Sequence, residues 1–137
     1  MTLGISFASI ANQIGMVMSK VQKITDRDGR LWVVIPTPSY IDGRSGQELL
    51  DVAYKLLEAG VNRLLFNMGD TRVVNSVGIS RLIEMIEKFD ESGGSVAFCT
   101  ARPIIIKTFR IMGLLQKASV YSSVQELAAS SFLPGGS

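Results

Sequence analysis

The sequence predicts an α/β fold with a mostly parallel mixed β-sheet, an N-terminal hairpin and about four helices. Two observations support this prediction. Two strand-like runs joined by an Asp-Gly turn come first, and after them helix-like and strand-like segments alternate, giving the order β-β-α-β-α-β-α-β-α. Alternating helices and strands form parallel sheets through right-handed crossovers, whereas an Asp-Gly turn joins antiparallel strands. With 137 residues, the chain is expected to form one domain.

The opening hairpin is predicted from residues 21–25 and 31–35. The first run alternates polar and apolar side chains, the second is continuously apolar (LWVVI), and residues 26–29 form the turn. A continuous apolar run suits a strand that is covered on both faces of the sheet. Pro36 and Pro38 end this strand, because proline has no N–H to donate to a neighbouring strand.

Helices and strands alternate after the hairpin. A capping box of the form S-x-x-E at residues 45–48 predicts the start of a helix, which Gly60 ends. The remaining helices are expected to start near Ser76, Pro103 and Ser123. The remaining strands are expected at residues 61–68, 95–99 and 118–121. Trp32 and Cys99 fall in predicted strands and are expected in the core.

Composition excludes several classes of function. The formal net charge of +2, from 14 basic and 12 acidic residues, is too balanced for nucleic-acid binding through bulk charge. The chain has no histidine, and Cys99 is its only cysteine, which excludes a His-dependent triad, a disulfide within the chain and a Cys-rich zinc site. No Gly-rich phosphate loop is present. We therefore expect a non-enzymatic cytoplasmic protein with no cofactor and no metal.

The two ends of the chain are expected to lie outside the domain, which is assigned to residues 18–130. Residues 1–17 are predicted to be a flexible extension and residues 131–137 a loose tail. Residues 1–19 carry no charge, but Ser, Asn, Gln and Gly interrupt their apolar side chains, and no basic region precedes them. Neither a membrane span nor a secretory signal is indicated, and membrane contact is not expected.

The strongest functional signal lies in residues 67–79, where a strand, a seven-residue loop and a helix start follow in order. In a structural interpretation, Asn75 or Ser76 caps the helix, and Gly78 allows close packing of its first turn. In a functional interpretation, Ser76 is a phosphorylation site. Phosphate adds nearly two negative charges, which the positive end of the helix dipole accommodates while the surface offered to a partner changes.

The order of elements and the run NSVGI at residues 75–79 resemble the STAS domain, which bacterial anti-sigma factor antagonists share with sulfate transporter tails. The similarity extends over residues 18–130. Two positions depart from the family pattern, because Asn67 and Asn75 stand where the family has Asp. A third, Ser39, stands where the family has Gly after the second strand. Asparagine keeps the capping ability of aspartate but not its charge.

The resemblance implies that the protein binds an anti-sigma factor that is also a serine kinase. Unphosphorylated antagonist captures this partner, phosphorylation of Ser76 releases it, and a phosphatase resets the cycle. The partner-binding residues that the resemblance implies are Ser39, Tyr40, Asp42, Asn75, Ser76, Val77 and Gly78. The same family implies an alternative, an accessory subunit of a lipid or sulfate transporter whose Ser76 is not phosphorylated.

One apolar run is too wide for a single helix stripe. Residues 104–106 are all isoleucine, so part of the run is expected to be exposed. Together with Phe109 and Met112, these residues are assigned either to the core or to a contact patch for a partner or a homodimer. Core packing is the preferred interpretation, since single exposed apolar residues are common.

Overall fold

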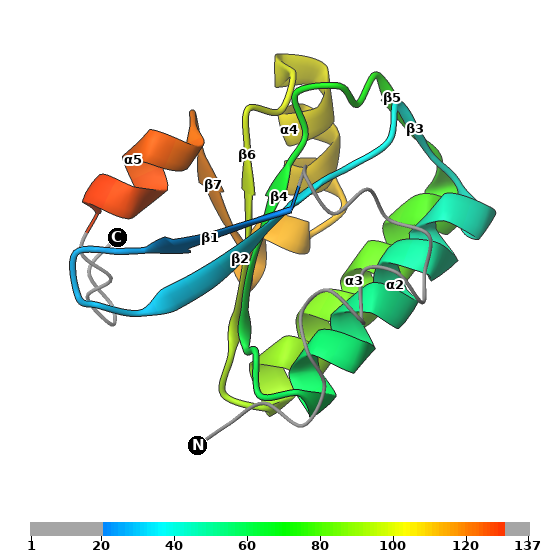
Figure 1. Cartoon of the computed structure of the whole chain (residues 1–137). Helices are drawn as coiled ribbons and strands as arrows, with labels where there is room; N and C mark the ends of the chain where they lie inside the picture. The colour runs from blue at the N-terminus through cyan, green and yellow to red at the C-terminus, as the bar shows by residue number, and fades with distance from the viewer. Residues whose placement is uncertain (1–20, 131–137) are drawn as a thin grey trace.

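The computed structural model describes residues 21–130, so the predicted extension (1–17) and tail (131–137) lie outside the described residues (Figure 1). Over these residues the predicted α/β fold is confirmed, with an N-terminal antiparallel hairpin, an otherwise parallel sheet and four helices. The sheet has the order β1-β2-β4-β6-β7, and its strands are β1 (Gln22–Thr25), β2 (Leu31–Pro36), β4 (Arg63–Asn67), β6 (Ser95–Cys99) and β7 (Ser119–Tyr121). The helices are α2 (Gly43–Glu58), α3 (Ser76–Glu91), α4 (Pro103–Ile111) and α5 (Val124–Ala129), with a 3-10 turn η2 (Leu114–Gln116).

Helices cover both faces of the sheet, as the continuous apolar strands require. The helices α2, α3 and α4 lie on one face and bury the larger core cluster, in which the Phe98 ring lies 5.9 Å from Phe66 and 5.0 Å from Phe109 between centroids. The helix α5 lies on the other face, where Leu127 joins a smaller cluster that contains Trp32 and Cys99. The predicted core positions of Trp32 and Cys99 are therefore confirmed.

The helix α2 begins earlier than predicted. Asp42, not Ser45, is its N-cap, and the capping box predicted at residues 45–48 is wrong. Asp42 Oδ1 accepts a hydrogen bond from the Ser45 N–H at 2.9 Å, and Ser45 Oγ accepts one from the Asp42 N–H at 3.0 Å. The Ser45 hydroxyl also donates to the Tyr40 carbonyl at 2.9 Å. This second contact ties Ser45 to the preceding segment, so the helix starts at the aspartate.

Two short strands were not expected. The strands β3 (Tyr40–Ile41) and β5 (Val73–Val74) pair in parallel and form a separate two-stranded sheet. Residues 69–75, predicted to be a loop throughout, therefore contain β5. Each strand has only two residues, and each finds its partner more than thirty positions away in the sequence, so no local periodicity marks it.

The isoleucine run divides between core and surface. Ile105 and Phe109 are buried, which confirms the preferred core assignment for these two residues. Ile104 and Met112 are exposed, with 61% and 49% of their surface accessible. The helix α4 therefore contributes to the core through one face and presents apolar side chains on the other.

Candidate functional site

Two loops meet at the carboxyl edge of the sheet, where ligand and partner sites of parallel sheets usually lie. One follows β2 and the other follows β4, and the pairing of β3 with β5 joins them. The Arg72 N–H donates to the Ser39 carbonyl at 2.7 Å, and the Asn75 N–H donates to the Ile41 carbonyl at 3.0 Å. The structure thereby brings together the two predicted partner-binding stretches, residues 39–42 and 75–78.

Two buried threonines fix the base of these loops. The Thr71 hydroxyl donates to the Pro38 carbonyl at 2.6 Å and lies 2.5 Å from the Thr37 hydroxyl, while the Thr37 N–H donates to the Asn67 carbonyl at 3.0 Å. Buried polar groups are stable only when hydrogen-bonded, and these bonds fix the relative position of the loops. Sequence reasoning missed both threonines, because their partners lie thirty or more residues away.

Asn75 caps α3 and contacts the facing loop at the same time. Its side-chain Oδ1 accepts a hydrogen bond from the Gly78 N–H at 2.8 Å, and its Nδ2 donates to the Tyr40 hydroxyl at 3.2 Å. Of the two capping residues that the sequence left open, Asn75 holds this position. An amide serves both contacts because it carries a donor and an acceptor.

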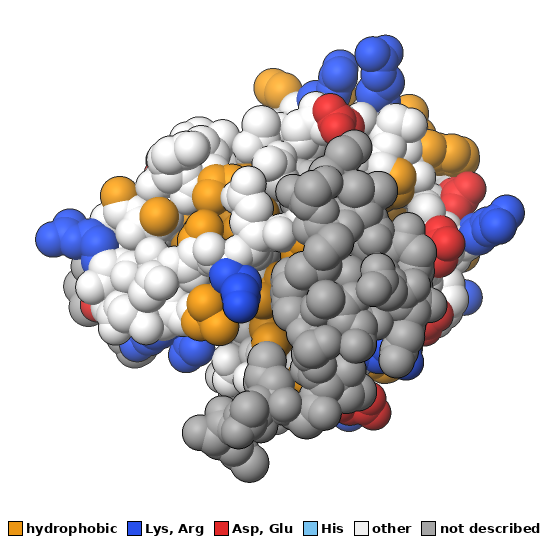
Figure 2. Space-filling view, viewed as in Figure 1, with side chains coloured by type: hydrophobic (Ala, Val, Ile, Leu, Met, Phe, Trp, Pro, Cys, Tyr) orange, Lys and Arg blue, Asp and Glu red, His pale blue; other side chains and the backbone are white. Residues whose placement is uncertain are grey.

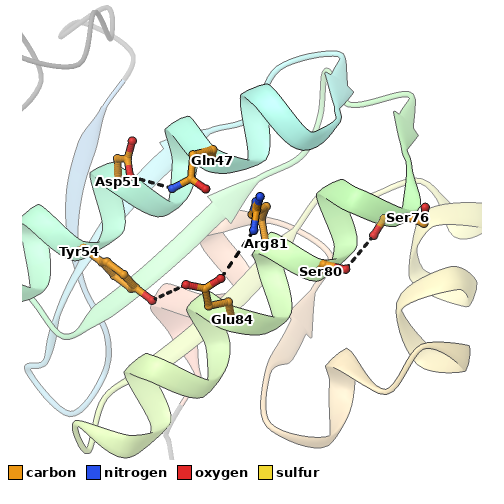
Figure 3. A network of polar contacts seen from close by, with 7 residues as sticks. All are labelled: Gln47, Asp51, Tyr54, Ser76, Ser80, Arg81 and Glu84. Atoms are coloured by element: carbon orange, nitrogen blue, oxygen red, sulfur yellow. Dashed lines mark hydrogen bonds and ion pairs between the residues drawn. The ribbon is translucent and has the colours of Figure 1, made fainter.

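Ser76 is therefore not needed as a cap. It is the first residue of α3 and is exposed, and only its carbonyl takes part in a side-chain contact, accepting from the Ser80 hydroxyl at 3.2 Å (Figure 3). Among the described residues, the Ser76 hydroxyl makes no hydrogen bond. The first turn of α3 contains no acidic residue, so a negative group here would meet the positive end of the helix dipole without a neighbouring carboxylate in that turn.

Glycines let the amino ends of α2 and α3 press against β3. A Cβ on Gly78 would lie 2.4 Å from the Ile41 carbonyl oxygen, and a Cβ on Gly43 would lie 2.9 Å from Val77 Cγ1. No larger side chain fits at Gly78 unless the backbone moves. Farther along the same helices, the Tyr54 hydroxyl donates to Glu84 Oε2 at 3.1 Å (Figure 3). This packing places Ser76 and Val77 at the edge of the molecule.

Three exposed apolar side chains lie in the segments next to the serine. Tyr40, Val73 and Val77 are respectively 47%, 52% and 47% exposed, and together with Ser76 we call them the Ser76 surface. Exposed apolar side chains grouped in this way are typical of protein-binding surfaces. Tyr40 and Val77 are among the residues that the resemblance implies. Val73 is not among them, and only the pairing of β3 with β5 brings it beside Tyr40.

The remaining predicted partner-binding residues support the backbone of the site. The Ser39 carbonyl accepts from the N–H groups of Arg72 and Val73, and Gly78 is buried at the start of α3. Asp42 caps α2, and the hydrogen bond from the Ser45 N–H lowers its pKa despite partial desolvation. Asp42 therefore stays ionised and holds the start of α2.

The described chain offers no metal site and no membrane-spanning helix. Within residues 21–130, no three Asp, Glu, Cys or His side chains gather closely enough to hold an ion. None of the helices in that range is long and apolar enough to cross a bilayer.

Comparison with known proteins gives a family and several structural neighbours. The STAS domain family model matches residues 18–127. A putative anti-sigma factor antagonist from Thermotoga maritima is 14% identical, with a TM-score of 0.61 over 77% of this chain and 89% of its own. RsbS S58E from Moorella thermoacetica is 17% identical, with a TM-score of 0.61 over 79% of this chain and 91% of its own.

The phosphorylated form of SpoIIAA, a Bacillus cell fate determinant, is 16% identical, with a TM-score of 0.57 over 77% of this chain and 94% of its own. No curated protein sequence matches the chain. At these identities the neighbours show a shared fold, and the family model covers most of the sequence. The chain belongs to the STAS domain family.

Proposed function

We propose that the protein is a regulatory binding module, an antagonist that binds an anti-sigma factor with serine kinase activity and releases it when Ser76 is phosphorylated. The observation that carries this proposal is the position of Ser76. Ser76 is exposed at the start of α3 and is not used for capping. The segments next to it carry the exposed side chains of Tyr40, Val73 and Val77.

The chemistry of this position favours a switch that acts on binding rather than on folding. A phosphate on Ser76 lies at a helix amino terminus, where unpaired N–H groups and the dipole stabilise negative charge. The same phosphate stands among apolar side chains that a partner would cover. Burying a doubly charged group in such an interface is costly unless the partner supplies cations, so phosphorylation weakens binding.

The structural neighbours support this proposal by their names. SpoIIAA is named as an anti-sigma factor antagonist and has been solved in unphosphorylated and phosphorylated forms. We infer the kinase partner and the phosphatase that would reset the cycle from the resemblance to STAS antagonists, and the exposed Ser76 hydroxyl supports this inference.

The test compares wild type with Ser76→Glu, Ser76→Ala and Ser92→Glu in capture experiments from native lysate, with bound proteins identified by mass spectrometry. Ser92→Glu is the matched control, because it adds the same charge at the opposite end of α3. We expect wild type, Ser76→Ala and Ser92→Glu to capture a kinase-like anti-sigma factor, and Ser76→Glu to retain about tenfold less of it. Equal capture of that partner by Ser76→Glu and wild type would exclude the switch.

A second candidate function is an accessory subunit of a lipid or sulfate transporter without phosphorylation of Ser76. The loop between β4 and α3, which we call the site loop, has neutral amides at the two positions where the family has Asp, and this favours the second candidate. Asn67 Oδ1 accepts from the Gly69 N–H at 3.1 Å, and Asn75 contacts Gly78 and Tyr40. Capture of the same transporter subunits by wild type and Ser76→Glu would support this candidate over the first.

A further inference from the structure

A groove lies beside the Ser76 surface, between β5 and the amino-terminal half of α4. Its volume is about 230 Å³, and we call it the α4–β5 groove. Its lining residues are Arg72, Val73, Val74, Ile104, Ile105 and Thr108. Ile105 is buried and Val74 partly buried, whereas Val73 and Ile104 are 52% and 61% exposed. The groove therefore has an apolar lining with two exposed apolar side chains.

One wall of this groove belongs to a stretch of the sequence that is rich in basic residues. No Asp or Glu occurs between residues 92 and 125, a stretch that includes all of α4 and contains four basic residues, Arg102, Lys107, Arg110 and Lys117. Arg72 adds a fifth cation, from the β5 side. Lys117 lies 3.5 Å from Asp90, so its charge is partly compensated.

One acidic residue, Asp70, lies near Arg72 in the sequence and is exposed. Figure 2 shows Lys and Arg side chains at the top of the view, over the end of the molecule that Figure 1 assigns to α4 and the loop before β5. Hydrophobic and acidic atoms lie beside them. A protein ligand that complements this surface carries negative charge around an apolar group.

We propose that the α4–β5 groove binds an acidic segment of the partner protein, with one apolar side chain of that segment seated between Val73 and Ile104. The inference rests on the proposed function for the identity of the partner, because Val73 belongs to both surfaces and a protein that covers Ser76 reaches the groove directly. The carboxylates of the segment face Arg72, the basic residue that lines the groove.

The shape of the surface favours a protein segment over a lipid bilayer. A side chain enters a groove, whereas a flat bilayer contacts what protrudes most. The most exposed large apolar side chain of α4 is Ile111, at 71%, and it does not line the groove. Substitution of Ile104 is therefore expected to weaken binding of a protein segment, whereas substitution of Ile111 is expected to weaken binding of a bilayer.

The test uses two helical probe peptides with leucines at helical spacing, one with glutamates and one with lysines at all other positions, and vesicles of anionic phospholipid. Amide chemical shifts of the ¹⁵N-labelled full chain locate the bound peptide. We expect the glutamate peptide to shift Arg72, Val73, Ile104 and Thr108, to bind more weakly as salt is raised, and to bind tighter than the lysine peptide.

Matched pairs of variants test the contacts. Ile104→Glu and Arg72→Glu are expected to weaken binding of the glutamate peptide about tenfold, whereas Ile111→Glu and Arg110→Glu, outside the groove, change it less than about twofold. The proposal is wrong if the glutamate peptide does not bind, if it shifts amides outside the groove, or if the lysine peptide binds with equal affinity. It is also wrong if Ile104→Glu and Ile111→Glu weaken binding of the glutamate peptide equally. Vesicle binding that Ile111→Glu abolishes, without groove binding of the peptide, would assign the surface to membranes instead.

The Ser76→Glu variant separates the two proposals. The groove proposal stands if this variant still binds the glutamate peptide in the groove, even where Ser76→Glu and wild type capture the same partners and the phosphorylation switch fails. The groove proposal fails by itself if Ser76→Glu releases the kinase-like partner while Ile104→Glu and Arg72→Glu capture it as well as wild type does.

Discussion

The turn of the β1–β2 hairpin and the loop between β4 and α3 are both organised by polar side chains, but of different chemistry. The hairpin turn is centred on the buried carboxylate of Asp26, whose Oδ2 accepts from the Trp32 indole at 3.0 Å. The β4–α3 loop is fixed by the side chains of Asn67, Thr71 and Asn75, which are neutral. The hairpin turn therefore depends on an ionised carboxylate, whereas the contacts made by Asn67, Thr71 and Asn75 in the site loop involve no ionised group.

Because of this difference, acid is expected to affect the hairpin turn but not the polar contacts of the β4–α3 loop. Protonation of Asp26 removes the charge that its donors stabilise, so the hairpin responds to acid. The amide and hydroxyl contacts of the site loop keep their charge state at every ordinary pH. Under the proposed function, a phosphate on Ser76, at the start of α3, would add charge beside a loop whose own hydrogen bonds do not titrate, and would alter binding without breaking those bonds.

The largest expected loss of stability is at Gly78, beside the site loop. Gly78→Ala places a Cβ 2.4 Å from the Ile41 carbonyl oxygen, so the start of α3 and β3 must separate. We expect the free energy of unfolding to fall by about 3 kcal/mol, measured by urea denaturation, with loss of partner capture. Gly29→Ala in the hairpin is the control. It has open space around it and a φ of +79°, and should cost about 1 kcal/mol. Equal losses in the two variants would contradict the crowding at Gly78.

The hairpin side is tested by Asp26→Asn. Asp26 Oδ1 accepts from the N–H groups of Asp28 and Arg30 at 2.9 and 3.0 Å, while Oδ2 accepts from Trp32. An amide has one oxygen, so at least one of these donors loses its acceptor. We expect a loss of about 2 kcal/mol in urea denaturation. Trp32 is the only tryptophan of the chain, so its fluorescence reports the same turn. Unchanged stability and emission would show that the carboxylate is dispensable.

The pH dependence of stability provides a second measurement on the same residue. Burial opposes ionisation of Asp26, but hydrogen bonds from Trp32, Arg30 and Asp28 outweigh it and lower its pKa below the ordinary value of 3.8. Because the folded pKa is lowered, the stabilisation is present above the ordinary pKa and disappears as the pH falls through the folded value. The urea midpoint of wild type should therefore fall more steeply below pH 3.8 than that of Asp26→Asn. Parallel profiles would exclude this linkage.

The same two regions show how far the sequence predicts the structure. The hairpin follows from local signals, an Asp-Gly turn between an alternating and a continuous apolar run, and its strands lie where expected. The helix start after β2 was misplaced because Asp42 and Ser45 both have the spacing of a cap, and only the contact of Ser45 with Tyr40 favours the first.

Part of the geometry of the candidate site follows from the sequence. The position of Ser76 at a helix start follows from the sequence, because periodicity and capping residues are local. The exposure of Val73 and the α4–β5 groove do not follow from it. They require the pairing of β3 with β5 and the packing of α4 beside it, which join segments far apart in the chain.

The smallest expected effect comes from Asn75→Asp, which gives the site loop the chemistry of the hairpin turn. A carboxylate at the N-cap still accepts from the Gly78 N–H, and the Tyr40 hydroxyl reverses its role and donates to it. Its charge interacts favourably with the helix dipole, so the free energy of unfolding in urea denaturation should rise by about 0.5 kcal/mol at neutral pH. Asn75→Ala, which removes both contacts, should cost about 1 kcal/mol. A destabilised Asn75→Asp variant would show that donation by the amide to Tyr40, rather than capping, explains the asparagine at this position.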